Sequence, residues 1–272
     1  MPRVAAVHIY PVKSLHRISP DHLDLRPWGP EGDRRWLVTD PDGNFISQRE
    51  CSAMALITPT PTALGLTLSR RDMADCVVRR PNDHAHRRHV RVWGDWMEAR
   101  EASQRAGEWL SAALGRPARL AYMDTPEAAR IRDVGGQANP VSFADEYPIL
   151  IANVASLDDL NTRLDEKLPM TRFRPNIVAE DAEAWEEDGW RRIRIGEAIL
   201  RVVSPCARCG ITSVDQETGE IRDRKQPLAA LASFRRGHGG VMFAQNATIE
   251  TPGRIAPGDT IEILERGESN LG

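Results

Sequence analysis

The sequence of 272 residues has few cysteines, few aromatic residues and no long hydrophobic run. No apolar stretch approaches the ~20 residues that a membrane-spanning helix needs, so we expect no membrane partner. The formal net charge of −3 provides no polycationic surface, and nucleic acid is therefore not an expected partner either. The first residues lead directly into strand-like sequence without a signal-peptide core, which makes the cytoplasm the expected compartment.

Only four cysteines are present, and two of them, Cys206 and Cys209, lie three positions apart between Pro205 and Gly210. Thiols stay reduced in the cytoplasm, which disfavours a disulfide framework and favours a metal or redox role. Arg208 precedes Cys209, and a guanidinium beside a thiol lowers its pKa. We therefore expect Cys209 to reach the thiolate form that binds metals. The C-x-x-C spacing alone is also compatible with a redox dithiol or half of a zinc site.

The chain is rich in short strand-like segments separated by turns. Strands are predicted over residues 4–12, 36–39, 45–47, 66–68, 76–78, 90–93, 193–195, 199–203 and 260–264. Apolar periodicity predicts three helices, over 102–114, 156–168 with Ser156 as N-cap, and 228–234 after Pro227. The stretch after Cys209 reads as a strand and a turn. This pattern indicates a sheet that curls or closes.

Four polar stretches at predicted strand ends or turns carry the candidate chemistry. They are Pro11–Leu15, Gly32–Trp36, Arg172–Asn176 and the cysteine loop. Brought together, they would form a cationic pocket around a thiolate. Lysine and arginine side chains with backbone N–H groups suit a phosphate-bearing ligand, and a soft thiolate suits a soft or redox-active metal.

These stretches, in this order, resemble those of the MOSC-domain molybdenum proteins. The nearest subset is the mitochondrial amidoxime-reducing component and its bacterial relatives, which reduce N-hydroxylated compounds. The resemblance extends from about Arg3 to about Leu264 and rests on the stretches Tyr10–Ser14, Asp33–Val38, Ala155–Asn161, Arg172–Val178 and Cys206–Asp215. It implies a β-rich α+β fold, with an N-terminal β-barrel-like domain over residues 1–120 packed on a MOSC β-barrel over residues 121–267, and a few helices.

The resemblance also implies a molybdenum–molybdopterin cofactor, with Cys209 as the metal ligand and catalytic residue. The cofactor-binding residues it implies are Lys13, Ser14, Arg34, Asp145, Glu146, Tyr147, Arg174, Asn176, Ala207, Arg208 and Cys209. Glu146 departs from relatives that have glycine or a small hydroxyl residue there. Its carboxylate should therefore point away from the anionic ligand, or the contact should be made by its backbone alone. We further expect Asp215 to orient the cysteine loop.

The implied reaction is the two-electron reduction of an N–O bond, or a related oxygen-atom transfer, on a small-molecule substrate. No four-cysteine cluster motif is present, so we expect no iron–sulfur cluster in this chain; pyridoxal phosphate is not expected either. Electrons should come from a separate protein of the ferredoxin, flavin or cytochrome type.

Other interpretations remain open from the sequence. A thioredoxin-like dithiol would need a helix after the cysteines, and a zinc site would need two further ligands. His84, His86 and His89 have suggestive spacing, but their arginine neighbours favour a solvated loop. His238, in a glycine-rich loop, could overhang the site or lie in a plain surface loop. A molybdopterin-binding or sulfur-carrier protein without reductase activity is the alternative function.

Overall fold

The largest element of the fold is an eight-stranded sheet that curls until its two edge strands meet. Our computed structural model describes residues 1–237 and 239–271. The strand order is β1 (Arg3–Val7), β14 (Ile177–Glu180), β13 (Ile149–Asn153), β18 (Gly240–Thr251), β16 (Ala198–Ala207), β15 (Trp190–Ile195) and β20 (Ile261–Arg266), with β17 (Arg236–Gly237) beside β18.

Backbone hydrogen bonds close this sheet into a barrel. The Val4 N–H donates to Asp259 O at 2.9 Å and the Ile261 N–H to Pro2 O at 2.8 Å, so β1 meets the segment that leads into β20. Alternating inward residues such as Val4, Ile193 and Leu200 are buried inside it. Closure leaves few unpaired edge groups, which suits a sheet of this length.

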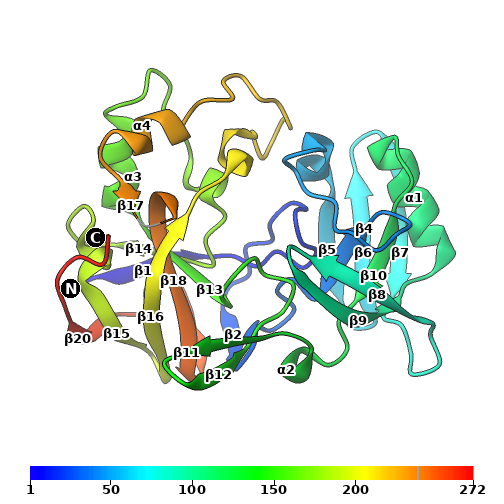
Figure 1. Ribbon diagram of the computed structural model, residues 1–272, viewed down its shortest axis with the longest axis horizontal. Helices are drawn as coiled ribbons and strands as arrows, with labels where there is room; N and C mark the ends of the chain where they lie inside the picture. The colour runs from blue at the N-terminus through cyan, green and yellow to red at the C-terminus, as the bar shows by residue number, and fades with distance from the viewer. Residues whose placement is uncertain (238, 272) are drawn as a thin grey trace.

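A second strand-rich lobe lies beside the barrel, at the right of Figure 1. One of its sheets has the order β4 (Trp36–Thr39), β10 (Arg119–Tyr122), β9 (Asp95–Glu101), β8 (Arg87–Val92); the other has β5 (Thr58–Thr62), β6 (Gly65–Arg70), β7 (Met73–Arg79). Helix α1 (Gln104–Leu114) packs on them. It buries Ala106, Leu110 and Ala113 at helical spacing and ends at Gly115, whose φ of 65° is left-handed.

Short elements complete the chain. They are β2 (Leu23–Arg26), β3 (Gly29–Pro30), β11 (Ile131–Val134), β12 (Gln137–Pro140), β19 (Arg254–Ile255), α2 (Pro126–Ala129), α3 (Val154–Asn161), α4 (Leu228–Ala232) and the 3-10 turns η1 (Ser52–Leu56), η2 (Met170–Phe173), η3 (Glu186–Gly189) and η4 (Gly210–Ser213). In the part of the chain described, no helix has the length and apolar character required to cross a membrane.

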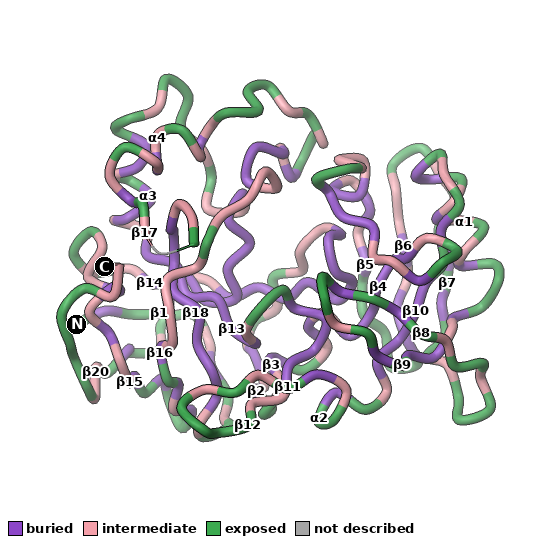
Figure 2. Tube along the Cα trace, in the orientation of Figure 1, coloured by how far each residue is buried: buried purple, intermediate pink, exposed green. Residues whose placement is uncertain are grey.

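Each lobe has its own buried interior, and buried chain also continues between them (Figure 2). The connecting contacts are polar. Tyr10 Oη donates to Pro175 O at 3.1 Å, and Arg174 Nη2 donates to Leu15 O at 2.8 Å. The first strand belongs to the barrel, while residues shortly after it lie against the other lobe. The loops that meet here bring the four polar stretches together.

The β-rich α+β fold class is confirmed, whereas several predicted elements have other limits. The predicted helix over 156–168 ends at Asn161, because the Asn161 side chain bonds to both the N–H and the C=O of Leu168 and fixes a loop. Its N-cap is Asn153, and Ser156 is buried instead. The predicted strand over 45–47 contributes only an isolated bridge between Phe45 and Thr39.

Candidate functional site

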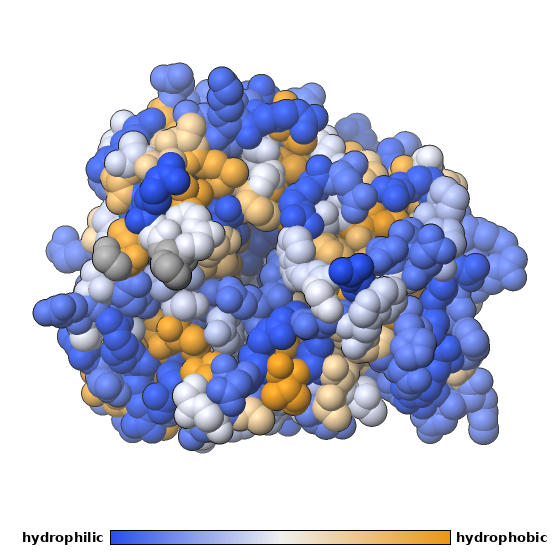
Figure 3. All heavy atoms as spheres, viewed as in Figure 1, coloured by the Kyte–Doolittle hydropathy of each residue, from blue (hydrophilic) through white to orange (hydrophobic). Residues whose placement is uncertain are grey.

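One cavity of about 150 Å³ lies where the loops of the two lobes meet. The molecular surface is hollowed between the lobes in this view (Figure 3). Every residue that the sequence predicted for the site lines this cavity: Lys13, Ser14, Arg34, Asp145, Glu146, Tyr147, Arg174, Asn176, Ala207, Arg208 and Cys209. The structure therefore brings together residues that lie up to almost two hundred positions apart, while their individual roles stay predictions.

Strained backbone is concentrated at this cavity. Four residues that line it have left-handed φ values without being glycine: Ser14 at 66°, Arg34 at 46°, Trp93 at 57° and Arg174 at 56°. Such a conformation costs roughly 1–3 kcal/mol per residue and persists only where the surrounding structure enforces it. The loops are thus held in shapes that aim these side chains at a common point.

Lys13 lies at the inner side of the cavity and is only 5% exposed. Its Nζ donates to Asp145 Oδ1 at 2.6 Å, which joins the two lobes. Burial lowers the pKa of Lys13 to about 8 from 10.5, although Asp145 opposes this shift. Desolvation alone would raise the pKa of Asp145, but the Lys13 ammonium outweighs it and holds that pKa well below its usual range. The pair is therefore charged at neutral pH.

Arg34 is fixed by groups from both lobes. Its Nη1 donates to Asp33 Oδ2 at 2.6 Å and to Asn176 Oδ1 at 3.0 Å. Asn176 is almost fully buried, and its Nδ2 donates to His8 O at 3.1 Å. Its Oδ1 also accepts from the Leu150 N–H at 3.2 Å, so the Asn176 amide is fixed by two backbone groups and in turn holds Arg34.

Arg174 belongs to a buried polar network behind the cavity. Its Nη1 donates to Gln216 Oε1 at 3.0 Å, and Gln216 exchanges hydrogen bonds with Gln48. Gln48 in turn donates to Ser14 O at 2.8 Å. Burial lowers the pKa of Arg174 to about 10, which still leaves it charged at neutral pH. The network ties the loop after the cysteines to the Lys13–Ser14 loop.

The cysteine loop begins within β16, which includes Cys206, and continues through Cys209 into η4. The predicted strand after Cys209 is wrong, because the hydroxyls of Thr212 and Ser213 donate to the carbonyls of Cys209 and Gly210 and support a tight 3-10 turn. The expected contact between Arg208 and Cys209 is also not observed. Arg208 Nη1 lies 2.9 Å from Cys206 Sγ instead. Burial raises the pKa of Cys206 despite this guanidinium.

Two cations of the cavity have no carboxylate partner among the described residues. Arg174 donates to the Gln216 side chain and the Leu15 carbonyl, and Arg208 to Cys206 Sγ and Phe173 O at 2.8 Å. An enclosed positive charge without a counter-ion is unfavourable. The cavity consequently suits an anionic ligand that supplies the missing charge.

Glu146 introduces a carboxylate at the outer side of the same cavity. Its Oε2 accepts a hydrogen bond from Asn246 Nδ2 at 3.3 Å, and its backbone O accepts from Arg132 Nε at 3.2 Å. Because its side chain is exposed and lines the cavity, it does not turn away from the site. Burial, with Glu146 adding to it, raises the pKa of the neighbouring Tyr147.

Asp215 acts on a neighbouring loop rather than on the cysteines directly. Its Oδ2 accepts from Arg172 Nη2 at 3.0 Å, and its Oδ1 accepts from the Glu217 and Thr218 N–H groups. Arg172 also donates to Ser213 O at 2.7 Å, so Asp215 supports the end of η4 through Arg172. Its expected influence on the cysteine loop stays a prediction.

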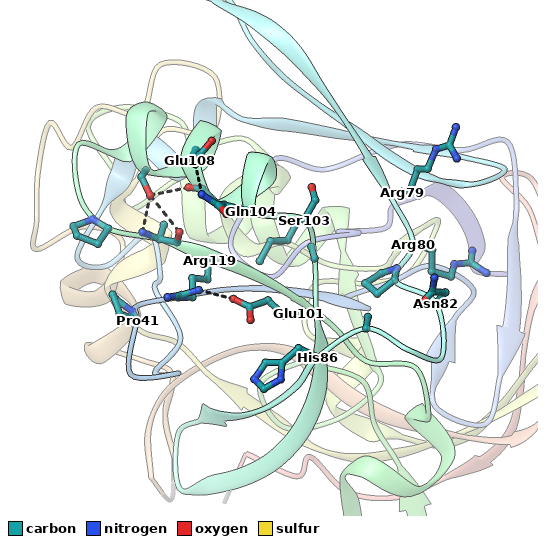
Figure 4. A pocket seen from close by; sticks show the side chains of 18 residues that line it. Pro41, Arg79, Arg80, Asn82, His86, Glu101, Ser103, Gln104, Glu108 and Arg119 are labelled. Carbon is teal, nitrogen blue, oxygen red and sulfur yellow. Dashed lines mark hydrogen bonds and ion pairs between the residues drawn. The ribbon is translucent and has the colours of Figure 1, made fainter.

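A much larger cavity of about 1080 Å³ contains none of the predicted residues (Figure 4). It lies beside α1 in the second lobe, and its charges are already neutralised in part, since Arg119 Nη1 donates to Glu101 Oε1 at 2.7 Å. The smaller cavity is the candidate site because of the residues that line it, and not because of its size.

The zinc interpretation gains no support from the described residues. His84, His86 and His89 are exposed at or before β8, and no group of three or more potential metal-ligating side chains occurs in the part of the chain that the structure covers. His238, considered as a residue that overhangs the site, lies outside the described residues.

Sequence reasoning missed Trp93 and Asn246, two residues of the cavity that lie outside the four polar stretches. Trp93 occupies a two-residue turn between β8 and β9, where glycine or asparagine is usual. Asn246 follows Gln245 in the middle of β18, where the two amides interrupt an apolar run. Each residue departs from the sequence pattern expected for its element. This departure was the signal by which the sequence could have indicated a functional position.

Two family models match the chain in succession. The model of the MOSC N-terminal beta barrel domain matches residues 1–117, and that of the MOSC domain matches residues 138–262. These matches confirm the resemblance drawn from the motifs.

Full-length relatives give the same result. The human protein named mitochondrial amidoxime-reducing component 1 is 32% identical over 280 residues, covering 96% of this chain and 82% of the relative. The mouse protein of the same name is 33% identical with 96% and 82% covered. Human mitochondrial amidoxime reducing component 2 is 34% identical over 242 residues, with 85% and 72% covered.

These names overturn one expectation. The cytoplasmic compartment predicted from the N-terminal sequence is contradicted, because the relatives are named as mitochondrial components. The first residues form β1. Their lack of a signal-peptide core reflects this strand and gives no information on the compartment.

Proposed function

The chain belongs to the amidoxime-reducing component family of MOSC-domain proteins, and from this premise we propose that it is a molybdenum-dependent oxidoreductase that reduces N-hydroxylated compounds. The observation that carries the proposal is the cavity between the lobes, where a cysteine pair meets the buried Arg174 and the partly buried Arg208, neither of which has a carboxylate partner among the described residues. Family membership supplies the reaction class, and the cavity supplies a site with suitable chemistry.

The donor set of the cavity fits a molybdenum–molybdopterin group. An anionic, phosphate-bearing pterin would supply the negative charge that Arg174 and Arg208 lack, and a soft thiolate is a suitable molybdenum ligand. In this proposal Cys209 holds the metal. Lys13, Ser14, Arg34, Arg174 and Arg208 hold the anionic part, Asn176 keeps Arg34 in place, and Asp145, Glu146, Tyr147 and Ala207 complete the wall. When bound, molybdenum provides a two-electron couple between Mo(IV) and Mo(VI).

The proposed reaction balances as a two-electron reduction. An amidoxime takes up two electrons and two protons, its N–O bond breaks, and an amidine and water are released. The chain's own part would be to bind the substrate at the outer side of the cavity, to hold the metal through Cys209, and to keep the charges of the interior fixed during turnover. Fixed cations around the cofactor limit reorganisation when charge moves.

Electrons come, in this proposal, from a separate redox protein of the ferredoxin, flavin or cytochrome type, as the word "component" in the relatives' names suggests. Neither nucleic acid nor a membrane is included among the partners. We also propose two sequence modules, residues 1–120 and 121–267; the matched ranges support this division. The first module nevertheless contributes β1 to the barrel of the second.

The first test is the metal content of protein purified from a molybdopterin-competent host. We expect about one molybdenum per chain in the wild type, because one thiolate site is proposed. The Cys209→Ala variant should lose the metal together with the reduction of an aryl amidoxime. Cys51→Ala, which removes a half-buried cysteine of the other lobe, is the matched control and should keep both.

Other outcomes would redirect the assignment. Zinc, or no metal, in the wild type would remove the basis of the reductase and favour a sulfur carrier or a zinc protein. Molybdenum retained at full occupancy in Cys209→Ala, with full activity, would show that another group is the ligand.

A further inference from the structure

The outer edge of the cavity has the opposite charge to its interior. Lys13 and Arg174, in the interior, are 5% and 8% exposed. At the edge, Trp93, Asp145 and Glu146 are all exposed and line the same cavity. We call these three residues the rim. A ligand in the cavity can therefore meet an aromatic ring and two carboxylates at its solvent-exposed edge.

The rim is a built feature, because Trp93 is held in place from several sides. Its Nε1 donates to Asp145 Oδ1 at 2.8 Å, and its ring contacts Phe45 edge-on with centroids 5.2 Å apart. Its backbone is left-handed, and its carbonyl accepts from Arg91 Nε at 2.7 Å. Because this indole is 43% exposed, burial alone does not explain why its position and backbone conformation are fixed by so many contacts.

The structure contains a direct example of what this ring binds. The Arg49 guanidinium carbon lies 4.1 Å from the Trp93 ring centroid, so a planar delocalised cation already stacks on the indole. A protonated amidine or guanidine has the same planar, delocalised charge. The indole is still 43% exposed with Arg49 stacked on it, so part of its surface is accessible to a ligand.

Glu146 provides the complementary charge. Asn246 holds its Oε2, and in the described part of the chain no lysine, arginine or histidine forms an ion pair with its carboxylate. Asp145 differs, since Lys13 already neutralises it. Of the two rim carboxylates, Glu146 is therefore the one without an ion-pair partner among the described residues.

We propose that the rim makes this enzyme selective for N-hydroxylated substrates that carry positive charge, with Glu146 and Trp93 as its specificity-determining residues. The inference rests on the proposed function and goes beyond it, because the family's reaction by itself does not fix the charge of the substrate. Attraction to the carboxylate and cation–π contact with the indole act on the same group. A substrate with a carboxylate substituent meets repulsion from Glu146 instead.

The test uses the holoenzyme and three aryl amidoximes with a para trimethylammonium, hydrogen or carboxylate substituent. The quantity measured is the ratio of kcat/KM between the cationic and the anionic compound, in which cofactor loading cancels. We expect the wild type to favour the cation by about tenfold or more, since both rim interactions contribute. Glu146→Gln should reduce this ratio about fivefold, and Trp93→Phe about threefold, because each removes one of them.

Matched controls lie on the same hairpin. Glu98→Gln and Trp96→Phe change an exposed glutamate and an exposed tryptophan that do not line the cavity, although Arg91 contacts Trp96 much as Arg49 contacts Trp93. Both controls should keep the wild-type ratio. A ratio near one in the wild type, or an equal fall in the controls, would overturn the role of the rim.

Calorimetric binding of benzamidinium and of uncharged benzamide provides a readout that needs no turnover. Benzamidinium that binds more tightly than benzamide, and less tightly to Glu146→Gln than to the wild type, supports the role of the rim. If such a protein reduces no N–O bond, the proposed function fails and the role of the rim stands. Reduction of all three amidoximes at equal kcat/KM, with no preference for benzamidinium, refutes the rim and leaves the proposed function standing.

Discussion

At the scale of single residues, the site depends on charges that are buried before any ligand binds. Lys13 and Arg174 are buried and Arg34 is partly buried. Lys13 and Arg34 donate to the carboxylates of Asp145 and Asp33, whereas Arg174 donates to an amide and a carbonyl. Such side chains cannot relax far when charge changes, because burial and several hydrogen bonds fix them. Their ionisation therefore responds to pH in a way that a surface lysine or arginine does not show.

Anion binding to the cofactor-free protein should weaken as pH rises through about 8. The lowered pKa of Lys13 means that its ammonium is fully charged below that value and is lost above it. We expect the affinity for inorganic pyrophosphate, measured by thermal shift or calorimetry, to fall about five- to tenfold from pH 7 to pH 9, as one enclosed charge disappears.

Lys13→Arg keeps its charge over this range and should abolish the fall. The exposed Lys225→Arg, as a control, should retain it. The same pH dependence in Lys13→Arg would assign the titration to another group.

At the scale of elements, the strands and helices follow local sequence patterns, whereas the conformation of the loops between them depends on contacts with distant parts of the chain. The helix α1 has the spacing that the sequence predicted, and its end is set by the left-handed Gly115. The cavity, in contrast, is built from strand ends and turns such as η4, whose conformation depends on hydroxyl and amide contacts made across the fold.

Gly115→Ala should destabilise the protein by about 1 kcal/mol in urea unfolding, because an L side chain resists the left-handed conformation. Nothing lies within 4 Å of a Cβ built there, so no steric clash contributes. Gly115→Asn, which tolerates this conformation better, should cost less. Equal losses in both variants would point to a cause other than backbone conformation.

Element prediction succeeded where a local pattern decides and failed where distant contacts do. The helix from Gln104 and the hairpin of β15 and β16 follow from periodicity and turn residues. The helix after Asn153 is shorter than its leucine spacing predicts, because the Asn161 side chain captures Leu168. The predicted strand after Cys209 failed for a similar reason, since side-chain hydroxyls close a 3-10 turn there.

At the scale of the whole molecule, the two lobes are joined through the site itself. Tyr10 lies almost fully buried between them, with the Arg34 and Arg174 guanidiniums stacked on its ring at 4.5 and 4.2 Å. Burial raises the pKa of its hydroxyl to about 12, so the group stays a donor to Pro175 O at physiological pH. Contacts of this kind make independent unfolding of either lobe unfavourable.

Tyr10→Phe should therefore lower the stability of both lobes together, by about 1 kcal/mol, because it leaves the Pro175 carbonyl without its partner. Native-state hydrogen exchange at Leu120 in one lobe and Ile193 in the other measures this directly. We expect equal decreases in protection at the two amides. A decrease at Ile193 alone would mean that the lobes unfold separately.

The sequence by itself determined the β-rich fold class and the family, and it predicted eleven residues that line the cavity, because ordered motifs and local periodicity can be recognised without knowledge of contacts. Only the tertiary structure decided which thiol Arg208 touches, that Asn176 and Asp215 act through neighbouring arginines, and that Trp93 joins Asp145 and Glu146 in one rim. The physical reason is that these relations depend on distances between residues far apart in the chain. A one-dimensional pattern specifies which chemical groups are present, but packing alone fixes which of them meet.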